Sequence, residues 1–423
     1  MKARVESFIA QHHLLENGRL VLVALSGGAD SVALLLVLHK LGYPLEALHC
    51  NFHLRGKESD RDCQFAEDLC RQMGVPLKVK HFQTAEYARH HEQSIEMAAR
   101  ELRYEWFVER LHETDAQAVA VGHHVDDQAE TLLLNLLRGT GIRGLAAMHP
   151  RQGHVVRPLL CTSHADILAY LRDKGQPYVT DSTNLVPDTR RNFIRLHIMP
   201  LLSQMQPNAP HALARTASLV QEALPYYQRG VEELMNQAGF AADSLQLESF
   251  RRAGSPSLLL HEWLAPYGFN PATTADMARH TECQTGTTWT SATHRVVADR
   301  GRLLLRPIHQ EVCAPCMRMQ TVDAIGHTGP EVAYFDADLI TLPLHTRLAQ
   351  TGDWFVPFGM KGRKLLSDFL TDCKADPVTK AAQYVVCHGE DIIWVVGRRS
   401  DNRYRVTAST RRILRIEQIE STD

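Results

Sequence analysis

The sequence has no long hydrophobic segment, no glycine-rich linker and no internal repeat. Its longest uninterrupted apolar run, Val32–Leu38, is far shorter than the roughly 20 residues that a membrane-spanning helix needs. No apolar core of a secretory signal is visible after Met1, and the nine cysteines are an odd number. We therefore expect a cytoplasmic protein with reduced thiols and no membrane partner.

The sequence also lacks an excess of positive charge, since its formal net charge is −2. The overall charge therefore does not indicate a nucleic-acid-binding protein. Local charge differs, because Arg398–Arg415 contains seven arginines and one aspartate, a local charge of +6. Such a cluster can neutralise phosphate groups of RNA, and it can equally be a solvated arginine surface. The residues that we select as candidate RNA contacts are Arg398, Arg399, Arg403 and Arg405.

A turn with two glycines, Ser26-Gly27-Gly28-Ala29-Asp30-Ser31, lies between the apolar runs Val21–Leu25 and Val32–Leu38. This order predicts a buried strand, a tight turn and a helix whose first N–H groups favour an anion. No lysine follows the glycines, which excludes the Walker phosphate-binding pattern. The carboxylate of Asp30 beside an anion site indicates a divalent cation between them. The alternative is an ordinary turn, which needs neither the flanking serines nor the acid.

Strand-like apolar runs alternate with helical patterns over the first half of the chain. We predict strands at 20–25, 45–50, 77–81, 117–121 and 154–156, and helices at 30–41, 59–73, 94–111, 126–138 and 164–174. Alternating strand–helix units predict an α/β fold with a doubly wound parallel sheet. Ligands of such sheets bind beyond the carboxyl ends of the strands, which is where the turn after the first strand lies.

The pattern changes near Pro200, and we place domain boundaries near residues 205 and 325, which leaves residues 1–205 as the first domain. Helical patterns at 212–238 and 257–265 predict a mainly helical middle domain over 206–325, with short strand-like pieces after Thr287. We expect residues 312–323 to be a connection. Residues 326–423 are expected to form a small α+β domain with strands at 384–387, 392–396 and 413–416.

A histidine and several acids follow the predicted strand at 117–121. On a helix, His123, Asp127 and Glu130 would share one face, with Asp126 beside them. Such a group can hold a magnesium ion, bind an ammonium group or accept a proton. Acids at a helix start also complement the helix dipole, which accounts for Asp126 and Asp127 but not for Glu130.

Two further motifs are set aside. Gly139–Gly144 matches G-x-G-x-x-G but follows a predicted helix, whereas a dinucleotide-binding loop must follow a strand. We interpret Gly139 as the end of that helix. Cys313 and Cys316 have no second ligand pair at zinc-finger spacing, so we interpret them as incidental thiols.

In the glycine turn and in several further blocks the chain resembles the bacterial tRNA(Ile)-lysidine synthetases, a branch of the PP-loop ATP pyrophosphatases. Residues 26–31 match the SGGxDS loop of that superfamily. Further agreeing blocks are 49–56, 96–104, 122–131, 138–144, 157–160, 181–184 and 191–195, and 351–362 resembles the GDRF-type signature of the family's last domain. The chain departs from the family pattern at Trp354, where many relatives carry arginine, and at 379–382.

The resemblance implies an ATP-dependent carbon–nitrogen ligase. ATP adenylates the oxygen on carbon 2 of the wobble cytidine in an isoleucine tRNA with a CAU anticodon. The ε-amine of L-lysine then attacks carbon 2, AMP leaves, and the product is lysidine. The expected ligands are therefore ATP, Mg²⁺, L-lysine and the tRNA, which the middle and C-terminal domains contact. The oligomeric state stays open, a homodimer included.

The resemblance also suggests roles for individual residues. ATP is expected to bind at Ser26, Gly27, Gly28, Ala29, Asp30 and Ser31, with Asp30 holding Mg²⁺. The side chain of free lysine has a pKa of ~10.4, so a carboxylate must bind its ammonium group and take a proton. The candidates for that role are Asp127, Glu130 and Asp126. Arg100 and Arg195 are candidates for binding a phosphate or the lysine carboxylate, and His123 for contacting the α-phosphate or the base.

The closest alternative is a PP-loop tRNA thiolase, which uses the same adenylation but delivers sulfur. That chemistry generally needs a cysteine pair near the nucleotide site or a bound cluster, and no C-x-x-C precedes Cys313. The thiols of the first domain are Cys50, Cys63, Cys70 and Cys161. A non-catalytic tRNA- or nucleotide-binding module is a second alternative, against which the acids at 30, 126, 127 and 130 argue.

Overall fold

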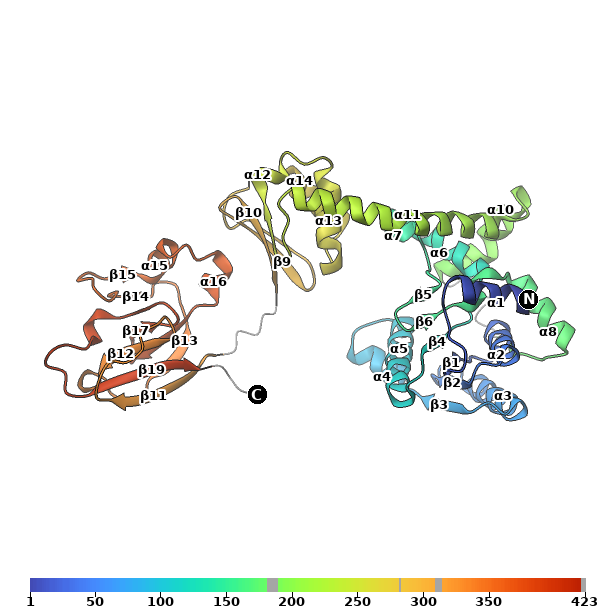
Figure 1. Ribbon diagram of the computed structural model, residues 1–423, viewed down its shortest axis with the longest axis horizontal. Helices are drawn as coiled ribbons and strands as arrows, with labels where there is room; N and C mark the ends of the chain where they lie inside the picture. The colour runs from blue at the N-terminus through green and yellow to red at the C-terminus, as the bar shows by residue number, and fades with distance from the viewer. Residues whose placement is uncertain (181–188, 281–282, 309–313, 420–423) are drawn as a thin grey trace. The chain divides into compact units, whose positions relative to one another are not determined.

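The computed structural model describes residues 1–180, 189–280, 283–308 and 314–419 (Figure 1). The chain divides into two compact units, residues 1–228 and 229–423. The matching block at 181–184 and the thiol of Cys313 lie outside the described residues. The division into three domains at 205 and 325 stays a prediction.

The first unit contains a six-stranded sheet in the order β3-β2-β1-β4-β6-β5. Its strands are β1 (Val21–Ala24), β2 (Leu45–Asn51), β3 (Leu77–His81), β4 (Ala118–Ala120), β5 (Arg151–Gln152) and β6 (Val155–Val156). Neighbouring strands are parallel except for β5, which pairs antiparallel with β6 at the edge. The predicted α/β fold and all five predicted strands are confirmed, and β5 is an addition.

Helices cover both faces of this sheet (Figure 1). They are α1 (Lys2–Gln11), α2 (Ala29–Leu41), α3 (Lys57–Met73), α4 (Thr84–His90), α5 (Ile95–Thr114), α6 (Val125–Leu137), α7 (Ile142–Leu145) and α8 (His164–Lys174). Successive β1 residues alternate between two cores: Val21 and Val23 pack with α2, while Leu22 packs with α5. Burial on both faces explains why β1 is continuously apolar. Each such side chain contributes roughly 1.5–3 kcal/mol when fully buried.

The loops after β1 and β4 leave the sheet at its topological switch point. Strand β1 pairs with β2 on one side and with β4 on the other, so the chain reverses its direction of winding between them. The two loops are in close contact, because a Cβ on Gly122 would lie 3.0 Å from the backbone carbon of Asp30. Any larger residue would push the two loops apart by a few tenths of an ångström, so glycine brings the residues after β4 onto the first turn of α2.

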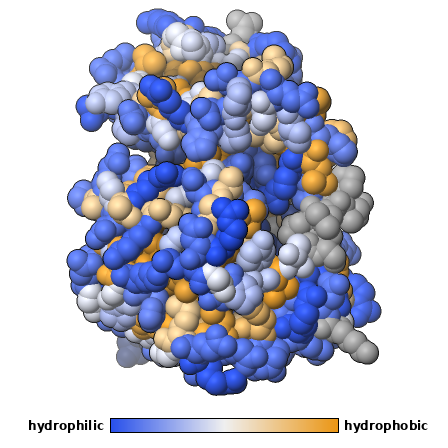
Figure 2. All heavy atoms as spheres, turned by 90° about the vertical axis from the view of Figure 1, so that its right-hand side faces the viewer, coloured by the Kyte–Doolittle hydropathy of each residue, from blue (hydrophilic) through white to orange (hydrophobic). Residues whose placement is uncertain are grey.

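The first unit ends with three short helical segments and part of a long helix. These are α9 (Arg190–Phe193), the π-helical turn Ile194–Ile198, α10 (Met199–Met205) and α11 (Ala209–Gln237). Helix α11 confirms the helix predicted over 212–238 and contains the division between the units. On the face drawn in Figure 2, apolar side chains form small groups among polar and charged ones.

The second unit begins with helices and a small antiparallel sheet. The helices are α12 (Leu247–Phe250), α13 (Pro256–Leu264) and α14 (Pro271–Arg279). The sheet has the order β7-β10-β9-β8, with β7 (Ser244–Gln246), β8 (Thr288–Thr290), β9 (His294–Asp299) and β10 (Arg302–Pro307). The strand-like pieces after Thr287 are therefore confirmed. Strand β7 is too short to give a sequence signal.

The rest of the second unit is an α+β arrangement, as predicted. One sheet has the order β11-β19-β12 and another β13-β16-β17-β18, while β14 pairs with β15. The elements are β11 (Cys316–Val322), β12 (Val332–Asp336), β13 (His345–Leu348), β14 (Trp354–Phe355), β15 (Lys364–Leu365), α15 (Leu366–Asp372), α16 (Pro377–Ala381), β16 (Tyr384–His388), β17 (Asp391–Val395), β18 (Arg399–Ser400) and β19 (Ile413–Ile419). No helix in the described part of the chain is long and apolar enough to cross a membrane.

The prediction of a connection over 312–323 is wrong, because residues 316–322 form β11. This strand pairs with β19 along its whole length, from Cys316 opposite Ile419 to Val322 opposite Ile413. Its side chains are mostly exposed, since β11 lies at the edge of its sheet. An exposed edge strand has little apolar alternation, so the sequence pattern did not reveal it.

We predict that Gly122→Ala destabilises the first unit by about 1–3 kcal/mol, because the added Cβ forces the loop after β4 away from α2. Native-state hydrogen exchange of peptides from the first unit, followed by mass spectrometry, measures this change. Gly141→Ala is the matched control in the same unit, since its Cβ meets no atom within 4 Å and its φ of -78° suits alanine. Equal stability of Gly122→Ala and the wild type would show that the two loops are not in contact.

Candidate functional site

The turn between β1 and α2 is shaped by its own serines. Gly27 has a φ of 90°, in the left-handed region, and Gly28 precedes the first residue of α2. The Ser31 hydroxyl donates to the carbonyl of Gly28 at 3.0 Å and accepts from the backbone N–H of Ser26 at 3.1 Å. The Ser26 hydroxyl accepts from the N–H of Gly28 at 3.3 Å. The serines therefore hold the turn at the positive end of the α2 dipole, as an anion site requires.

His123 precedes helix α6, so the expectation that it shares a helical face with Asp127 and Glu130 is wrong. The helix begins at Val125, and His124 is its N-cap. Burial lowers the pKa of His123 to about 4, which leaves the imidazole neutral at pH 7. Its Nδ1 is buried without a hydrogen-bond partner among the described residues. His123 therefore offers a neutral polar edge, not a positive charge.

His124, which the sequence analysis did not select, lies among three carboxylates. Its Nε2 is 3.6 Å from Asp30 Oδ1 and 3.4 Å from Asp127 Oδ2, and its Nδ1 is 3.2 Å from Asp126 Oδ2. Burial alone would lower the pKa of His124, but the hydrogen bond with Asp126 and the charges of Asp127 and Asp30 outweigh it. Together they raise the pKa to about 9. The ring is therefore an imidazolium ion at neutral pH.

Asp126 joins the start of helix α6 to the start of helix α8. Its Oδ2 accepts from the backbone N–H of His164 at 2.8 Å. Burial would raise the pKa of Asp126, but the hydrogen bonds from His124 and His164 lower it to about 2. The carboxylate is therefore ionised over the whole physiological range, and it fixes the first residue of α8 beside the turn after β1.

Two arginines from the segment 190–198 neutralise the acids of helix α6. Glu130, only 1 % exposed, binds the Nε of Arg191 at 3.0 Å and the Nε of Arg195 at 2.6 Å. The guanidinium of Arg195 also lies 3.2 Å from Asp127 Oδ1. Both oxygens of Glu130 are thus occupied by arginines. Asp127 is engaged as well, since its Oδ2 accepts from the backbone N–H of His124 at 3.1 Å. Of the two acids Asp127 is the more exposed, at 12 % of its side chain against 1 % for Glu130.

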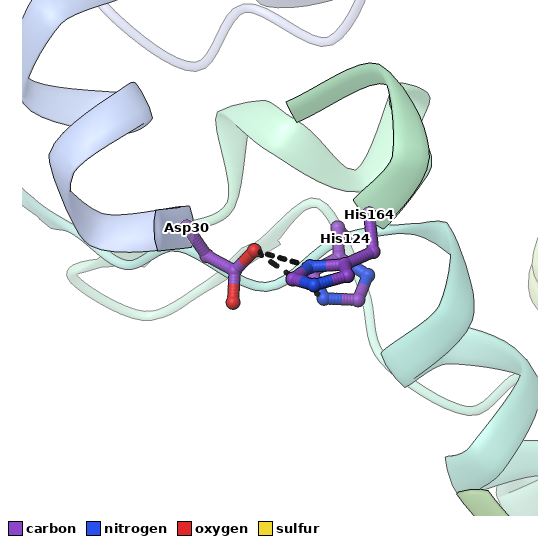
Figure 3. Close-up of side chains that lie close together, drawn as sticks. All are labelled: Asp30, His124 and His164. Carbon is purple, nitrogen blue, oxygen red and sulfur yellow. Dashed lines mark hydrogen bonds and ion pairs between the residues drawn. The ribbon is translucent and has the colours of Figure 1, made fainter. Parts of the chain in front are cut away.

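Arg191 and His164 were missed by the sequence analysis for different reasons. Arg191 lies four residues before Arg195 in a short basic cluster. On a helix this spacing places both side chains on one face, so Arg191 could have been selected together with Arg195. His164 is the first residue of α8, and only the tertiary fold brings its Nδ1 to 2.9 Å from Asp30 Oδ1 (Figure 3).

Arg100 lines a cavity of the first unit. Its guanidinium stacks on the ring of Tyr104, and both residues line this cavity of about 530 Å³ together with Arg157. No ion pair joins Arg100 to the acidic residues of the site within the described residues. The predicted pairing of Arg100 with a phosphate or carboxylate therefore stays a prediction, with this cavity as its place.

The four candidate arginines of the C-terminal region are partly neutralised. Arg403 is bound by Asp401 and Asp391, which raise its pKa, and Arg398 donates to Gln383. Arg399 and Arg405 are exposed. The local charge of +6 thus overstates the positive surface, and Arg399 and Arg405 are the arginines of this set best placed to meet RNA.

Comparisons with known proteins agree along nearly the whole chain. Residues 1–202 match the family model of a PP-loop domain, and residues 241–308 match that of the TilS substrate binding domain. The chain is 43% identical to a tRNA(Ile)-lysidine synthase of Parabacteroides distasonis, over 97% of this chain and 98% of that protein. It is 42% identical to one of Bacteroides thetaiotaomicron, over 98% and 99%. Among solved structures it resembles a U34-tRNA thiolase from Methanococcus maripaludis, with a TM-score of 0.44, 20% identity, and coverage of 52% of this chain and 78% of that chain.

We predict that His124 makes the metal-free protein less stable as the pH rises. Its pKa is raised from 6.5 to about 9, so its contribution is fully present below pH 6.5 and is lost as the pH passes through 9. The stability difference between the wild type and His124→Gln should shrink by on the order of 3 kcal/mol between about pH 6 and pH 10. Urea unfolding in the presence of a chelator measures it, and a difference that does not change with pH would refute the imidazolium assignment.

Proposed function

The chain belongs to the tRNA(Ile)-lysidine synthase family, and on that premise we propose that it ligates L-lysine to carbon 2 of the wobble cytidine in a CAU-anticodon isoleucine tRNA. ATP is the activating substrate, and the products are lysidine, AMP and pyrophosphate. The reaction takes place in the cytoplasm. Residues 1–205 form the catalytic domain in this proposal, and residues 206–325 and 326–423 contact the tRNA.

One observation carries the proposal: an anion-binding turn and a group of ionised acids meet at the switch point of the sheet. Asp30 belongs to the first turn of α2, and His124 and Asp127 belong to the start of α6. The 3.6 Å between Asp30 and His124 brings the two loops into one site. A site that cleaves ATP next to a cationic amine needs this juxtaposition of a phosphate cradle and carboxylates.

The first step in this proposal is the adenylation of the cytidine. The oxygen on carbon 2 is a poor leaving group, and transfer of AMP to it supplies a good one. The free N–H groups at the start of α2 bind the departing pyrophosphate. Mg²⁺ prefers oxygen ligands, so Asp30 is the residue of this cluster that suits it, with nucleotide oxygens and water as the other ligands. Arg195 is the candidate for neutralising charge at the reacting phosphate, because Asp127 and Glu130 hold its guanidinium in place while 35 % of its side chain stays exposed.

The second step is the attack by lysine, for which we assign Asp127 as the ammonium-binding group. Burial alone would raise the pKa of Asp127, but the charges of His124 and Arg191 outweigh it and lower the pKa. An ionised, largely buried carboxylate attracts the ε-ammonium group strongly, because few water molecules screen the charges. Glu130 acts through Arg191 and Arg195, and Asp126 acts through His124 and the start of α8.

The cysteines of the first unit do not support sulfur transfer. Burial raises the pKa of the Cys50 thiol to about 12 and those of Cys70 and Cys161 to about 11, and it also raises the pKa of Cys63. A thiol needs to lose its proton before it attacks, and these shifts disfavour the thiolate. Lysine ligation is therefore favoured over the thiolase alternative.

We predict that Asp30→Asn and Asp127→Asn impair different steps. Asp30→Asn should lower tRNA-dependent pyrophosphate release, because the nucleotide loses a cation-binding oxygen. Asp127→Asn should lower lysine transfer by about 10²-fold or more, and by a larger factor than pyrophosphate release. Incorporation of radiolabelled lysine and release of pyrophosphate from the same reactions provide the two readouts.

Asp166→Asn is the matched control for these variants. Asp166 is a half-exposed acid in the first turn of α8 whose partners are Ser163 and Arg4, and asparagine can keep the helix cap. It should retain full activity. Wild-type lysine transfer by both Asp30→Asn and Asp127→Asn would refute the roles assigned to them.

We also predict that a variant with Cys50, Cys63, Cys70 and Cys161 all changed to alanine keeps its lysine-incorporating activity. Alanine avoids placing an unsatisfied polar group in the core, where Cys63 and Cys70 are buried. Nucleoside analysis of the product tRNA is the measurement, with circular dichroism as the check on folding. A folded variant that no longer modifies the tRNA would support chemistry at one of these thiols.

A further inference from the structure

Asp30, His124 and His164 come together from three separate elements beyond the carboxyl ends of β1 and β4. Figure 3 shows the Asp30 carboxylate, at the start of α2, directed at the rings of His124 and His164. His124 precedes α6 and His164 is the first residue of α8. One oxygen or ring nitrogen from each residue lies within 4.8 Å of the corresponding atoms of the other two. The lysine ligation proposed above uses Asp30 as a ligand of Mg²⁺. It gives neither His124 nor His164 a metal-binding role.

The spacing of these atoms fits a single cation bound by all three residues. Asp30 Oδ1 lies 2.9 Å from His164 Nδ1 and 3.6 Å from His124 Nε2. A tetrahedral metal ion with bonds of about 2.1 Å separates its ligand atoms by roughly 3.4 Å. Small side-chain rotations therefore bring three ligands onto one ion. The exposed part of His164, 45 % of its side chain, leaves room for water as a further ligand.

The surroundings of His124 match those of a metal-bound histidine. When one ring nitrogen of histidine binds a metal, the other usually donates to a carboxylate, which orients the ring. Here Nε2 points to the cluster, while Nδ1 lies 3.2 Å from both Asp126 Oδ2 and the backbone N of Asp126, whose N–H it accepts as the N-cap of α6. Asp126 also binds the backbone N–H of His164. Asp126 therefore fixes the positions of both histidines, and a metal ion on Nε2 would shift the contact of Nδ1 from the N–H to the carboxylate.

The donor set selects the class of cation. Two imidazole nitrogens and one carboxylate oxygen suit zinc and similar ions such as cobalt, whereas Mg²⁺ prefers oxygen ligands throughout. The negative charge of Asp30, Asp126 and Asp127 attracts a divalent cation to this position. Binding of the ion releases the proton that His124 carries in the metal-free protein.

We propose that Asp30, His124 and His164 form a site for a divalent transition-metal ion of the zinc class, which fills in the absence of nucleotide. This site differs from the Mg²⁺ that accompanies ATP, since it depends on the two histidines. Its test requires neither ATP nor tRNA. If no metal binds, the proposed lysine ligation is therefore unaffected. If the protein does not ligate lysine, the metal proposal is likewise unaffected.

The experiment is a titration of the metal-free, full-length protein with Co²⁺, followed by visible absorption. The wild type should show an intensified band of nitrogen and oxygen coordination that saturates at one Co²⁺ per chain and disappears when Zn²⁺ is added. His164→Ala should weaken Co²⁺ binding about tenfold or more. Asp126→Asn, which changes only a supporting contact, should weaken it about 10- to 100-fold.

His112→Ala is the matched control, because His112 is an exposed histidine in the last turn of α5. It should bind Co²⁺ as the wild type does. Because the side chain of His164 is half-exposed, we expect His164→Ala to fold. Circular dichroism checks that it does. The proposal is overturned if Co²⁺ binds His164→Ala as tightly as the wild type, or if the spectrum shows the charge-transfer band of a cysteine thiolate.

Discussion

The concentration of negative charge at the switch point of the sheet is the constraint on which the site depends. Four carboxylates, those of Asp30, Asp126, Asp127 and Glu130, converge there, and Glu130 and Asp127 are buried. Buried charges are costly unless they are paired. The imidazolium of His124 and the guanidinium groups of Arg191 and Arg195 supply the pairing. Negative charge that these cations do not neutralise remains on the acids. It suits the two cations that enter the site in our proposal, Mg²⁺ and the ammonium group of lysine.

The sequence predicted the positions of strands and helices well wherever an apolar run is buried on both sides. Strand β1 and helix α2 were predicted within one or two residues, because Val21–Leu25 and Val32–Leu38 leave no other arrangement once the glycine turn separates them. Strand β11 was missed, since its exposed side chains carry no periodic signal. Most of the fold of the first unit was therefore predictable, whereas the edge strand β11 could be recognised only once its pairing partner β19 was known.

The site was predictable in its acids but not in its cations. Asp30, Asp127 and Glu130 follow strand ends, and a parallel sheet brings such positions together. The choice between His123 and His124 depended on where α6 begins, and a shift of one residue exchanged a neutral buried ring for an imidazolium. His164 and Arg191 reach the site only through tertiary packing. Charge counted along the sequence likewise overlooked Asp391 and Asp401, which neutralise Arg403.

The oxygen on carbon 2 of the wobble cytidine ends in AMP only if the base itself is adenylated. An isoleucine tRNA carrying ¹⁸O at that position would be incubated with ATP, L-lysine and the protein, and the products examined by mass spectrometry. We expect the label to appear in AMP, in the same amount as lysidine in the tRNA. Label that stays in the tRNA, or that enters AMP without lysidine being formed, would rule out ligation through an adenylated cytidine.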